Sequence, residues 1–310
     1  MDILSDILQT MKLRGTAYFR ASFHSPWGMD IAAGQFANFH VVLDGSCWLR
    51  NHADGRLHEL TAGDIAMFPH GSPHALSCTP ECKTVPATTL LESTQREASD
   101  GTVFGGDGRA TTTLVCGHFE YDRKLSHPLF ETLDDLITVS PDTDFRPGWA
   151  ITAAELASQI SAGSTPGAAA IADRLAEALF IQALTGYIAE RDDSESFLGA
   201  LFDRQISQAL SLMHEDIAYN WTLERLAQTV AMSRSQFAQR FRLLVGETPM
   251  LYLARWRMLR AHELLVATQR PLVDVAEAVG YRSEFAFSKA FKKIVGRPPG
   301  AVRRRLAARS

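Results

Sequence analysis

The sequence predicts an α+β protein with an N-terminal antiparallel β-barrel, a helical hairpin, and a C-terminal all-α domain. Three observations support this fold class. The first 120 of the 310 residues contain short β-rich runs bounded by Gly, Asp and Pro. The last 90 residues repeat one helical pattern, and their charge differs sharply from that of the rest of the chain. A chain of this length is expected to form about two domains.

The composition is that of a globular chain, with 46% hydrophobic residues. No apolar run approaches the roughly 20 residues needed to cross a bilayer. The N-terminal segment MDILSDILQTMKLRG carries acidic residues where a secretory signal carries positive charge. We therefore expect a cytoplasmic protein without a membrane partner. In a reducing compartment its four cysteines, Cys47, Cys78, Cys82 and Cys116, are expected to be thiols or ligands rather than disulfides.

Two β-rich segments, GQFANFHVVLDGSCWLRN and LTAGDIAMFPHGSPHAL, are predicted to form hairpins of an antiparallel barrel. They resemble the two sequence motifs of the cupin superfamily. In the first motif Gly34 and His40 match, whereas Val42 stands at the second His position and Ser46 or Cys47 at the Glu position. In the second motif the matching residues are Gly63, Pro69, Gly71 and His74, and Cys78 stands at the final polar position.

The resemblance implies that the matched positions face a common centre inside the barrel, and alternation along the strand adds Val42 to the same side as His40. We expect His40, Val42, Cys47 and His74 to line an effector pocket. Two imidazoles and one thiolate would suit zinc, so His40, Cys47 and His74 are also a candidate metal site. The third interpretation is an ordinary polar pocket without metal. Because half of the usual ligand set is replaced, we expect no catalysis; the alternative is a metal-dependent cupin enzyme fused to the C-terminal helical domain.

The middle of the chain is predicted to change from strand to helix. TTTLVCGHFEYD, residues 111 to 122, alternates like a strand, and PLFETLDDLITV, residues 128 to 139, begins a helical run. Residues 172 to 193 have a broad apolar stripe on one helical face, and the loop SAGSTPG separates them from a preceding helix. This hairpin is expected to form domain core or a dimer interface. The charged stretch ERDDSESF is typical of a linker.

Charge is distributed unevenly behind the net value of −4. Residues 221 to 310 hold 17 Lys and Arg against 6 Asp and Glu, whereas residues 1 to 220 hold 14 against 29. A basic terminal domain favours a polyanionic partner, because Lys and Arg that neutralise phosphates release condensed counterions. The alternative is a basic face that is merely solvated.

The basic region contains an internal repeat, TLERLAQTVAMSRSQFAQRFRLLVGETP at 222 to 249 and PLVDVAEAVGYRSEFAFSKAFKKIVGRPP at 271 to 299. Leu223 and Ala227 recur 49 residues later, whereas Phe237 and Phe241 recur 50 residues later. The offset therefore changes once, inside a turn. Each copy reads as a short helix, a tight turn and a longer amphipathic helix, which is helix-turn-helix order. The polar face of each second helix would fit the major groove of DNA.

Two such units joined by a long helix, near residues 252 to 268, resemble the DNA-binding domain of the AraC/XylS family of transcription regulators. The resemblance covers about residues 200 to 305 and implies double-stranded DNA as the partner. By position, the candidate base contacts are Arg234, Ser235, Gln239, Glu284, Ser288 and Lys289. Arg240, Lys292 and Lys293 are expected to hold phosphates instead.

Residues 13 to 140 also resemble the cupin-type subgroup of this family that includes a reactive-chlorine-responsive activator. Cys116 matches one of the cysteines that act there, but the other has no counterpart in this chain. Cys78 and Cys82, in SCTPEC, are an alternative thiol pair. The redox candidates are therefore Cys78, Cys82 and Cys116.

Together these patterns predict a sequence-specific DNA-binding transcription regulator that senses a small molecule, a metal or an oxidant. It is expected to be a homodimer and, if it is an activator, to contact RNA polymerase. The predicted domains are a cupin-like sensor barrel over 1–140, a helical hairpin over 141–190, a linker over 191–199 and the DNA-binding domain over 200–310.

Overall fold

A computed structural model describes residues 2–11, 14–89, 102–106, 110–120, 127–140, 166–190 and 196–307. The chain folds into two compact units. One, the β unit, comprises residues 13–121 and 133–191, and the other, the helical unit, comprises residues 1–12, 122–132 and 192–310. None of the helices that the structure describes is long and apolar enough to cross a membrane.

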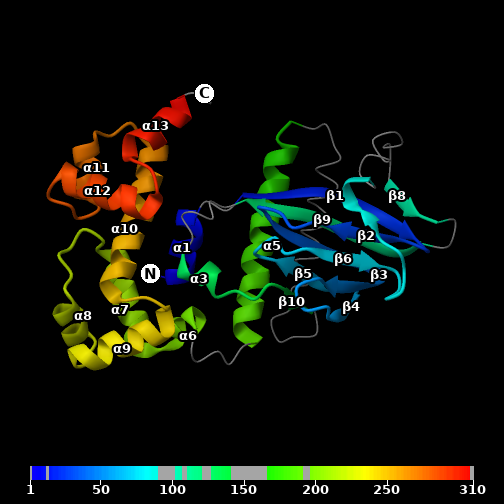
Figure 1. The fold of residues 1–310 in the computed structure, drawn as a ribbon, viewed down its shortest axis with the longest axis horizontal. Helices are drawn as coiled ribbons and strands as arrows, with labels where there is room; N and C mark the ends of the chain where they lie inside the picture. Colours follow the sequence, from blue (N-terminus) through cyan, green and yellow to red (C-terminus); the bar gives the residue numbers. More distant parts are fainter. Residues whose placement is uncertain are drawn as a thin grey trace. The chain divides into compact units, whose positions relative to one another are not determined.

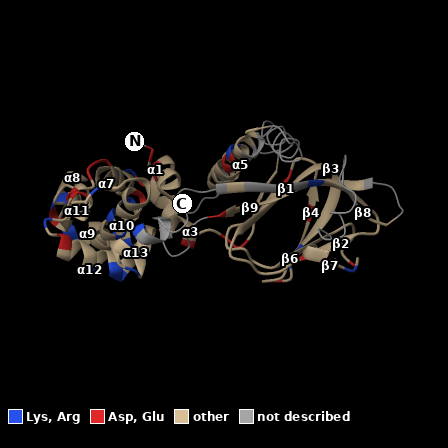
Figure 2. Ribbon diagram, turned by 90° about the horizontal axis from the view of Figure 1, so that it is seen from above, with Lys and Arg blue, Asp and Glu red and all other residues tan. Residues whose placement is uncertain are grey.

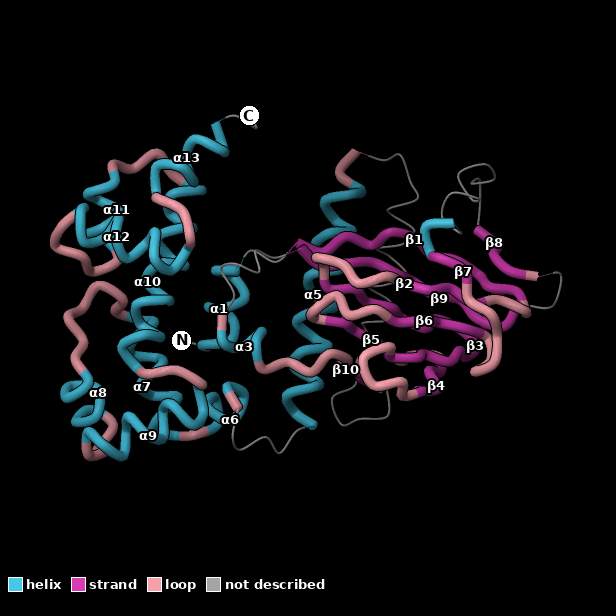
Figure 3. The backbone as a smooth tube through the Cα atoms, in the orientation of Figure 1, coloured by secondary structure: helices cyan, strands magenta, loops and turns pink. Residues whose placement is uncertain are grey.

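The β unit is a curled, mostly antiparallel sheet with the strand order β7-β2-β6-β3-β9-β1-β8 (Figures 1 and 3). Only β1 with β8 and β2 with β7 pair in parallel among the described strands. The strands are β1 Arg14–His24, β2 Gly28–Ile31, β3 Ala37–Asn51, β4 Leu57–Thr61, β5 Ile65–Phe68, β6 His74–Ser77, β7 Val85–Pro86, β8 Thr102–Gly105, β9 Ala110–Glu120 and β10 Ile137–Val139. The predicted strand near 111–122 is thereby confirmed as β9.

The first cupin-like segment is one long strand, β3, and not the predicted hairpin. Its first half pairs with β9 and β5, and its second half pairs with β6 and β4. The pairing with β9 shifts register between Val42 and Asp44, and Gly45 follows with φ of 75°. A Cβ atom at Gly45 would lie 1.9 Å from the Thr111 carbonyl oxygen. Glycine therefore allows β3 to bend at this bulge and to continue across the curled sheet.

Helix α5, Ala168–Glu190, packs against β1 and β10 in the β unit. Its apolar stripe is the core face: Leu179, Phe180 and Leu184 are at most 2% exposed. Gly15 on β1 allows the close approach, because a Cβ there would lie 2.6 Å from the Ala176 Cβ atom. The interpretation of this stripe as domain core is thus supported. The first helix of the predicted hairpin and most of the predicted linker lie outside the described residues.

The helical run predicted from residue 128 is wrong beyond its first turn. Helix α3, Pro128–Glu131, ends there, and residues 137–139 form β10, which pairs with β5. The apolar pattern of 128–139 fits a helix, but Ile137 and Val139 are buried at a sheet edge that only the tertiary fold supplies.

The helical unit contains the repeat. Its helices are α1 Ile3–Met11, α3, α6 Phe197–Phe202, α7 Arg204–Glu215, α8 Leu223–Thr229, α9 Arg234–Val245, α10 Pro249–Ala267, α11 Leu272–Ala278, α12 Glu284–Val295 and α13 Pro299–Ala307. The pairs α8–α9 and α11–α12 are the two helix-turn-helix units, and α10 is the predicted long helix, which begins three residues earlier than expected.

The same local signals build both copies of the repeat. Ser233 and Ser283 cap the N-termini of α9 and α12 with their side chains, and Gly246 and Gly296 end these helices in the left-handed conformation. Met232 N–H donates to the Ala227 carbonyl, and 49 residues later Tyr281 N–H donates to the Ala276 carbonyl. The second turn has one more residue before its capping serine, so the offset between the copies changes from 49 to 50 residues.

The predicted boundary at residue 140 differs from the observed units at two places. Helix α1 and the residues around α3 belong to the helical unit, where α1 packs on α7 and α10. The buried face of α1 includes Ile3, Ile7, Leu8 and Met11. An apolar helical stripe predicts burial, but it does not specify which distant element covers it.

Candidate functional site

The second helices of the two repeats, α9 and α12, each bury one face and expose the other. Phe237 and Phe241 of α9 and the equivalent pair of α12, Phe287 and Phe291, are fully buried. The predicted DNA contacts are exposed, with Ser288 half-buried. Figure 2 shows Lys and Arg concentrated on the helical unit. The repeat thus presents two matched polar faces.

Two of the predicted cationic contact residues already have carboxylate partners within the helical unit. The Arg240 guanidinium donates from Nε to the Asp203 carboxylate at 2.9 Å, and a second nitrogen lies at 2.9 Å from the same oxygen. Arg234 Nε lies 3.0 Å from the Glu224 carboxylate across the first unit. Arg240 therefore ties α9 to the N-terminus of α7, so its predicted phosphate contact would have to compete with this ion pair.

An exposed aromatic ring, that of Phe285, lies in the first turn of α12 next to the predicted contact Glu284, and sequence reasoning did not single it out. Phe285 is 80% exposed and directly follows Ser283 and Glu284 in the first turn of the helix. The first-turn residues of a recognition helix are those that contact base edges in the major groove. The sequence signal was the extra Phe in SEFAF, which the apolar pattern of the repeat does not need.

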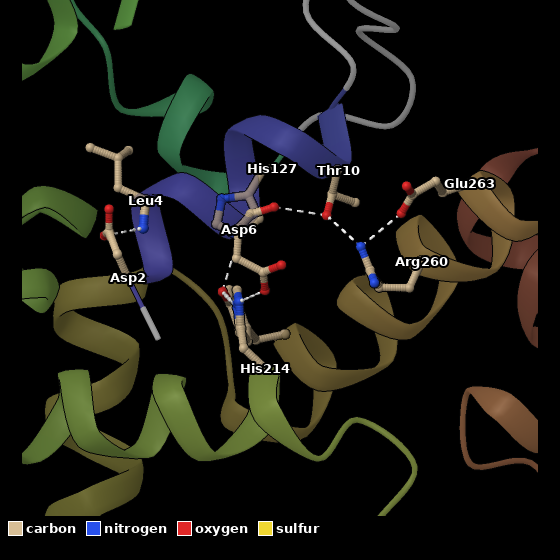
Figure 4. A network of polar contacts seen from close by, with 9 residues as sticks. Asp2, Leu4, Asp6, Thr10, His127, His214, Arg260 and Glu263 are labelled. Atoms are coloured by element: carbon tan, nitrogen blue, oxygen red, sulfur yellow. Dashed lines mark hydrogen bonds and ion pairs between the residues drawn. The ribbon is translucent and has the colours of Figure 1, made fainter. Parts of the chain in front are cut away.

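A buried polar chain ties α1 and the segment before α3 to the helices of the DNA-binding repeat (Figure 4). Leu129 N–H donates to His127 Nδ1, so His127 Nε2 donates to the Tyr252 hydroxyl at 3.0 Å. That hydroxyl donates to His214 Nε2 at 2.7 Å, and His214 Nδ1 donates to Asp6 at 2.8 Å. Every donor finds an acceptor while both imidazoles stay neutral.

Charge surrounds the outer end of this chain. Arg260 donates to the Thr10 hydroxyl at 3.2 Å and to Glu263 at 2.7 Å, as Figure 4 shows. Burial lowers the pKa of His214, although Asp6 acts in the opposite direction. Burial also lowers the pKa of His127 well below its ordinary value. The interior of this network therefore consists of neutral hydrogen-bonded side chains, and its charged groups, Asp6, Arg260 and Glu263, lie at one end.

In the β unit the structure brings His40 and His74 together. Their Nε2 atoms lie 2.8 Å apart, and His74 Nδ1 lies 2.8 Å from the Ser72 carbonyl. Because a carbonyl only accepts, His74 Nδ1 carries the proton, and its Nε2 accepts from His40 Nε2. His40 Nδ1 then accepts from the Cys116 thiol, 3.0 Å away. The three side chains and a carbonyl form one directed chain of hydrogen bonds.

Burial keeps this chain uncharged. It lowers the pKa of His40 well below the ordinary value, with a further contribution from His74, and lowers the pKa of His74 to about 4. Burial likewise raises the pKa of the Cys116 thiol. The Phe68 ring stacks on His74 at 3.6 Å between centroids. Such a set offers two neutral imidazoles and a protonated thiol, and no carboxylate.

The predicted triad of His40, Cys47 and His74 is not brought together as a set of metal ligands. In the described ranges, no group of three or more His, Cys, Asp or Glu side chains is arranged to hold a metal ion. Cys116, across from His40 in the β3–β9 register, takes the place predicted for Cys47. Cys47 lies beyond the bulge in β3, packed with Val42 in the apolar core. The residues present therefore do not fit the zinc site that the cupin resemblance suggested.

The predicted effector pocket is also part of the packed core. His40, Val42, Cys47 and His74 are at most 4% exposed. An open pocket of about 380 Å³ lies elsewhere in the β unit, and its lining includes Phe23, Trp27, Phe104, Cys82 and Lys83. Phe23, Trp27 and Phe104 also belong to the apolar cluster that holds Val42 and Cys47.

Comparisons with known proteins agree with both units. A cupin family model matches residues 2–189, and a helix-turn-helix domain model matches residues 226–305. The chain is 30% identical to the HTH-type transcriptional regulator AlkR of Acinetobacter baylyi, over 94% of this chain and 96% of AlkR. It is 30% identical to a putative AraC-like transcription regulator of Streptomyces lividans, over 98% of both chains. The chain belongs to the AraC-like family of transcription regulators.

A third relative of this AraC-like regulator is the RCS-specific HTH-type transcriptional activator RclR of Escherichia coli. The two are 26% identical over 99% of this chain and 98% of RclR. The family predicted from the repeat and the two cupin-like motifs is thereby confirmed, together with the predicted fold class. The protein is a DNA-binding regulator with an N-terminal cupin domain.

The thiol candidates of this AraC-like regulator differ in environment. Cys47 and Cys116 are buried, whereas Cys78 and Cys82 are half-buried, and all four are free thiols. Burial raises the pKa of Cys47 to about 12, with a further contribution from Asp64. Cys116 was a redox candidate from its sequence position, but its thiol is buried and held by His40. The structure therefore separates two inert cysteines from two accessible ones.

Proposed function

We propose that this regulator binds its operator through α9 and α12 and that its cupin domain senses a small effector. The observation that carries the first part is the matched pair of helices, each with two buried Phe rings behind an exposed polar face. An α-helix fits the major groove, where base edges can be distinguished. Two units spaced along one chain can contact successive stretches of the same duplex face.

The contacts divide by position on each helix. We assign Ser235, Gln239, Ser288 and Lys289 to base edges, together with the first-turn residues Arg234 and Glu284. Lys292 and Lys293 lie in the last turn of α12 and have no described ion pair, so we assign them to phosphates. Phosphate contacts fix position without selecting sequence.

The cupin domain is proposed to sense and not to catalyse. A metal-dependent cupin enzyme needs several ligands that leave coordination positions open for substrate. Here the ring nitrogens of His40 and His74 are used in hydrogen bonds to each other, to Ser72 and to Cys116. The alternative of a fused cupin enzyme therefore has no geometric support, and the open pocket beside Trp27 is the better place for an effector.

A homodimer is the proposed assembly, because two-fold symmetry would pair two half-sites on the operator and increase affinity. An activator would in addition contact RNA polymerase. Both partners are inferred from the class of regulator. Mass measurement in solution with and without operator DNA tests the dimer.

The experiment that tests DNA recognition uses the full-length chain, because α1 and the α3 segment are part of the helical unit. Binding sites are first selected from random duplexes, and affinity is then measured against salt. We expect affinity to fall steeply with salt, and Lys292→Ala to weaken all sequences alike and reduce the slope by about one. Lys289→Ala should instead relax preference at one position, at a cost of roughly 1 to 3 kcal/mol.

Arg56→Ala, an exposed cation of the β unit, is the matched control and should leave both measurements unchanged. An affinity for DNA that does not change with salt concentration would contradict the assignment of phosphate contacts. Uniform loss of affinity in both Lys variants would show that the assignment of base and phosphate contacts along α12 is wrong.

A further inference from the structure

We propose that Cys78 and Cys82 are a redox-active dithiol, in which Cys78 attacks a two-electron oxidant such as a peroxide and Cys82 resolves the product into a disulfide. The proposal rests on the sensing role given to the cupin domain and names the site and the chemistry of the signal. It is carried by the converging hydrogen bonds at Cys78, by the turn that returns Cys82 to it, and by the adjoining pocket.

The backbone holds the two cysteines in one small loop. Strand β6 ends at Ser77, and the Cys78 N–H donates to the Trp27 carbonyl at 3.1 Å. Four residues later, Cys82 N–H donates to the Thr79 carbonyl at 3.2 Å and closes a turn. This turn brings Cys82 back toward Cys78, and the Cys82 thiol contributes to lowering the pKa of Cys78. The loop is therefore short enough for an internal disulfide.

Two donors point at the Cys78 sulfur. The Trp27 N–H lies at 3.4 Å and the Ser25 hydroxyl at 3.7 Å. Burial alone would raise the pKa of Cys78, but these hydrogen bonds outweigh it and lower the pKa. Burial and the neighbouring Cys78 raise the pKa of Cys82. The pair thus contains one thiol prepared to ionise and one that keeps its proton, as a nucleophile and a resolving thiol require.

The site is open to small molecules. Cys82 lines the pocket of about 380 Å³ together with Phe23, Trp27 and Phe104. Both cysteines are half-buried, in contrast to Cys47 and Cys116. A small uncharged oxidant can enter this pocket, because most of its lining is apolar.

The chemistry balances with a peroxide as the oxidant. The Cys78 thiolate attacks one peroxide oxygen, an S–O bond forms, the O–O bond breaks, and the departing hydroxide takes a proton to become water. The Cys82 sulfur then attacks the sulfenic sulfur of Cys78, and an S–S bond replaces the S–O bond. The second hydroxide leaves with the Cys82 proton as water. Two thiols lose two electrons, and one peroxide becomes two waters.

Oxidation would act first on Trp27. A disulfide sulfur carries no negative charge, so the Trp27 N–H would lose its strong acceptor. The Trp27 ring lies 4.3 Å from that of Phe23 on β1, and its Nε1 donates to Thr111 on β9 at 3.2 Å. The other ends of these paired strands continue along the chain into α1 and into residues 122–132. Both continuations belong to the helical unit, so the chain itself connects the thiols to the DNA-binding unit.

The test exposes the full-length reduced protein to stoichiometric hydrogen peroxide, followed by alkylation in denaturant and tryptic mass analysis. Cys78 and Cys82 lie in one tryptic peptide, residues 57–83, which should lose two hydrogens and resist alkylation. Cys47 and Cys116 lie in other peptides and should remain fully alkylated. Cys82→Ser should accumulate a sulfenic acid at Cys78 that a dimedone probe captures, whereas Cys78→Ser should slow oxidation by about tenfold or more.

Ser25→Ala tests the geometry without removing a thiol. It should shift the pH profile of Cys78 alkylation to higher pH, with Ser46→Ala as a control on the same unit. Earlier oxidation of Cys116 or Cys47, or no disulfide at all, would overturn the proposal. A disulfide that forms but leaves operator affinity unchanged would overturn the role as a switch. Absence of operator binding in reduced and oxidised protein alike would instead count against the proposed DNA recognition.

Discussion

At the scale of single residues, the β unit depends on imidazoles that stay neutral. His40 and His74 use all four ring nitrogens in a directed chain from the Cys116 thiol to the Ser72 carbonyl. A proton added to either ring would turn an acceptor into a donor and place two donors face to face. Burial lowers both pKa values, with a further contribution from His74 at His40 and from His52 at His74.

This neutrality predicts a pH-dependent stability. The unfolded chain binds protons at His74 below its ordinary pKa of 6.5, whereas the folded protein does so only near 4, so lower pH favours unfolding across that window. We expect the free energy of unfolding of the β unit to fall by about 2 kcal/mol between pH 7 and pH 5. Urea titrations at each pH measure this free energy. Oxidation of Met67, which is buried in the folded β unit, reports when that unit unfolds.

His74→Gln should remove the contribution of His74 to this pH dependence and leave that of His40, whereas His58→Gln, which changes a histidine outside the core, should keep both. A His74→Gln protein that loses stability on acidification as steeply as the parent would assign the effect to other groups.

The exposed ring of Phe285 gives a second residue-scale prediction. Phe285→Ala should reduce affinity for the selected operator by about 1 kcal/mol or more and should weaken preference for a T·A pair, since an apolar side chain contacts the thymine methyl group. The salt slope should not change, because no charge is removed. Competition between operator variants measures the preference. Val273→Ala, an exposed apolar position on α11, is the control; equal losses in both variants would argue against a base contact by Phe285.

At the scale of elements, α1 is the unexpected member of the helical unit. Its apolar side packs on α7 and α10, and its Asp6 ends the chain of hydrogen bonds through His214, Tyr252 and His127. Helix α10 connects the two helix-turn-helix units. The stability of the DNA-binding unit should therefore depend on the first residues of the chain.

Ile7→Ala tests this dependence. Ile7 is fully buried, so the substitution should destabilise the helical unit by about 2 to 5 kcal/mol through lost burial and a cavity. Hydrogen exchange followed by mass spectrometry should show faster exchange in peptides of α7 and α10 and unchanged exchange in β3 and β9. Gln9→Ala, on the exposed side of the same helix, should change neither set. Faster exchange in β3 and β9 alone would show that α1 stabilises the β unit and not the helical unit.

At the scale of the whole molecule, charge and repeat order were enough to predict the DNA-binding domain. The basic excess after residue 221 and the two copies of Phe, Phe, Gly and Pro at fixed spacing depend only on local sequence. Caps, left-handed glycines and buried Phe pairs then form as each copy predicts, because helix signals act within a few residues. The two helix-turn-helix units and the long helix between them were accordingly predicted from the sequence.

The sequence by itself determined the family, the helix-turn-helix repeat, the strand that became β9, and the pairing of His40 with His74. Only the tertiary structure decided that Cys116 and not Cys47 hydrogen-bonds to His40, that residues 137–139 form a strand, that α1 joins the DNA-binding unit, and that Cys78 is the thiol that accepts from Trp27 and Ser25. The physical reason is the same in each case. Strand register and the partner of an apolar helix are set by contacts between residues far apart in sequence, and local periodicity carries no information about which distant surface supplies them.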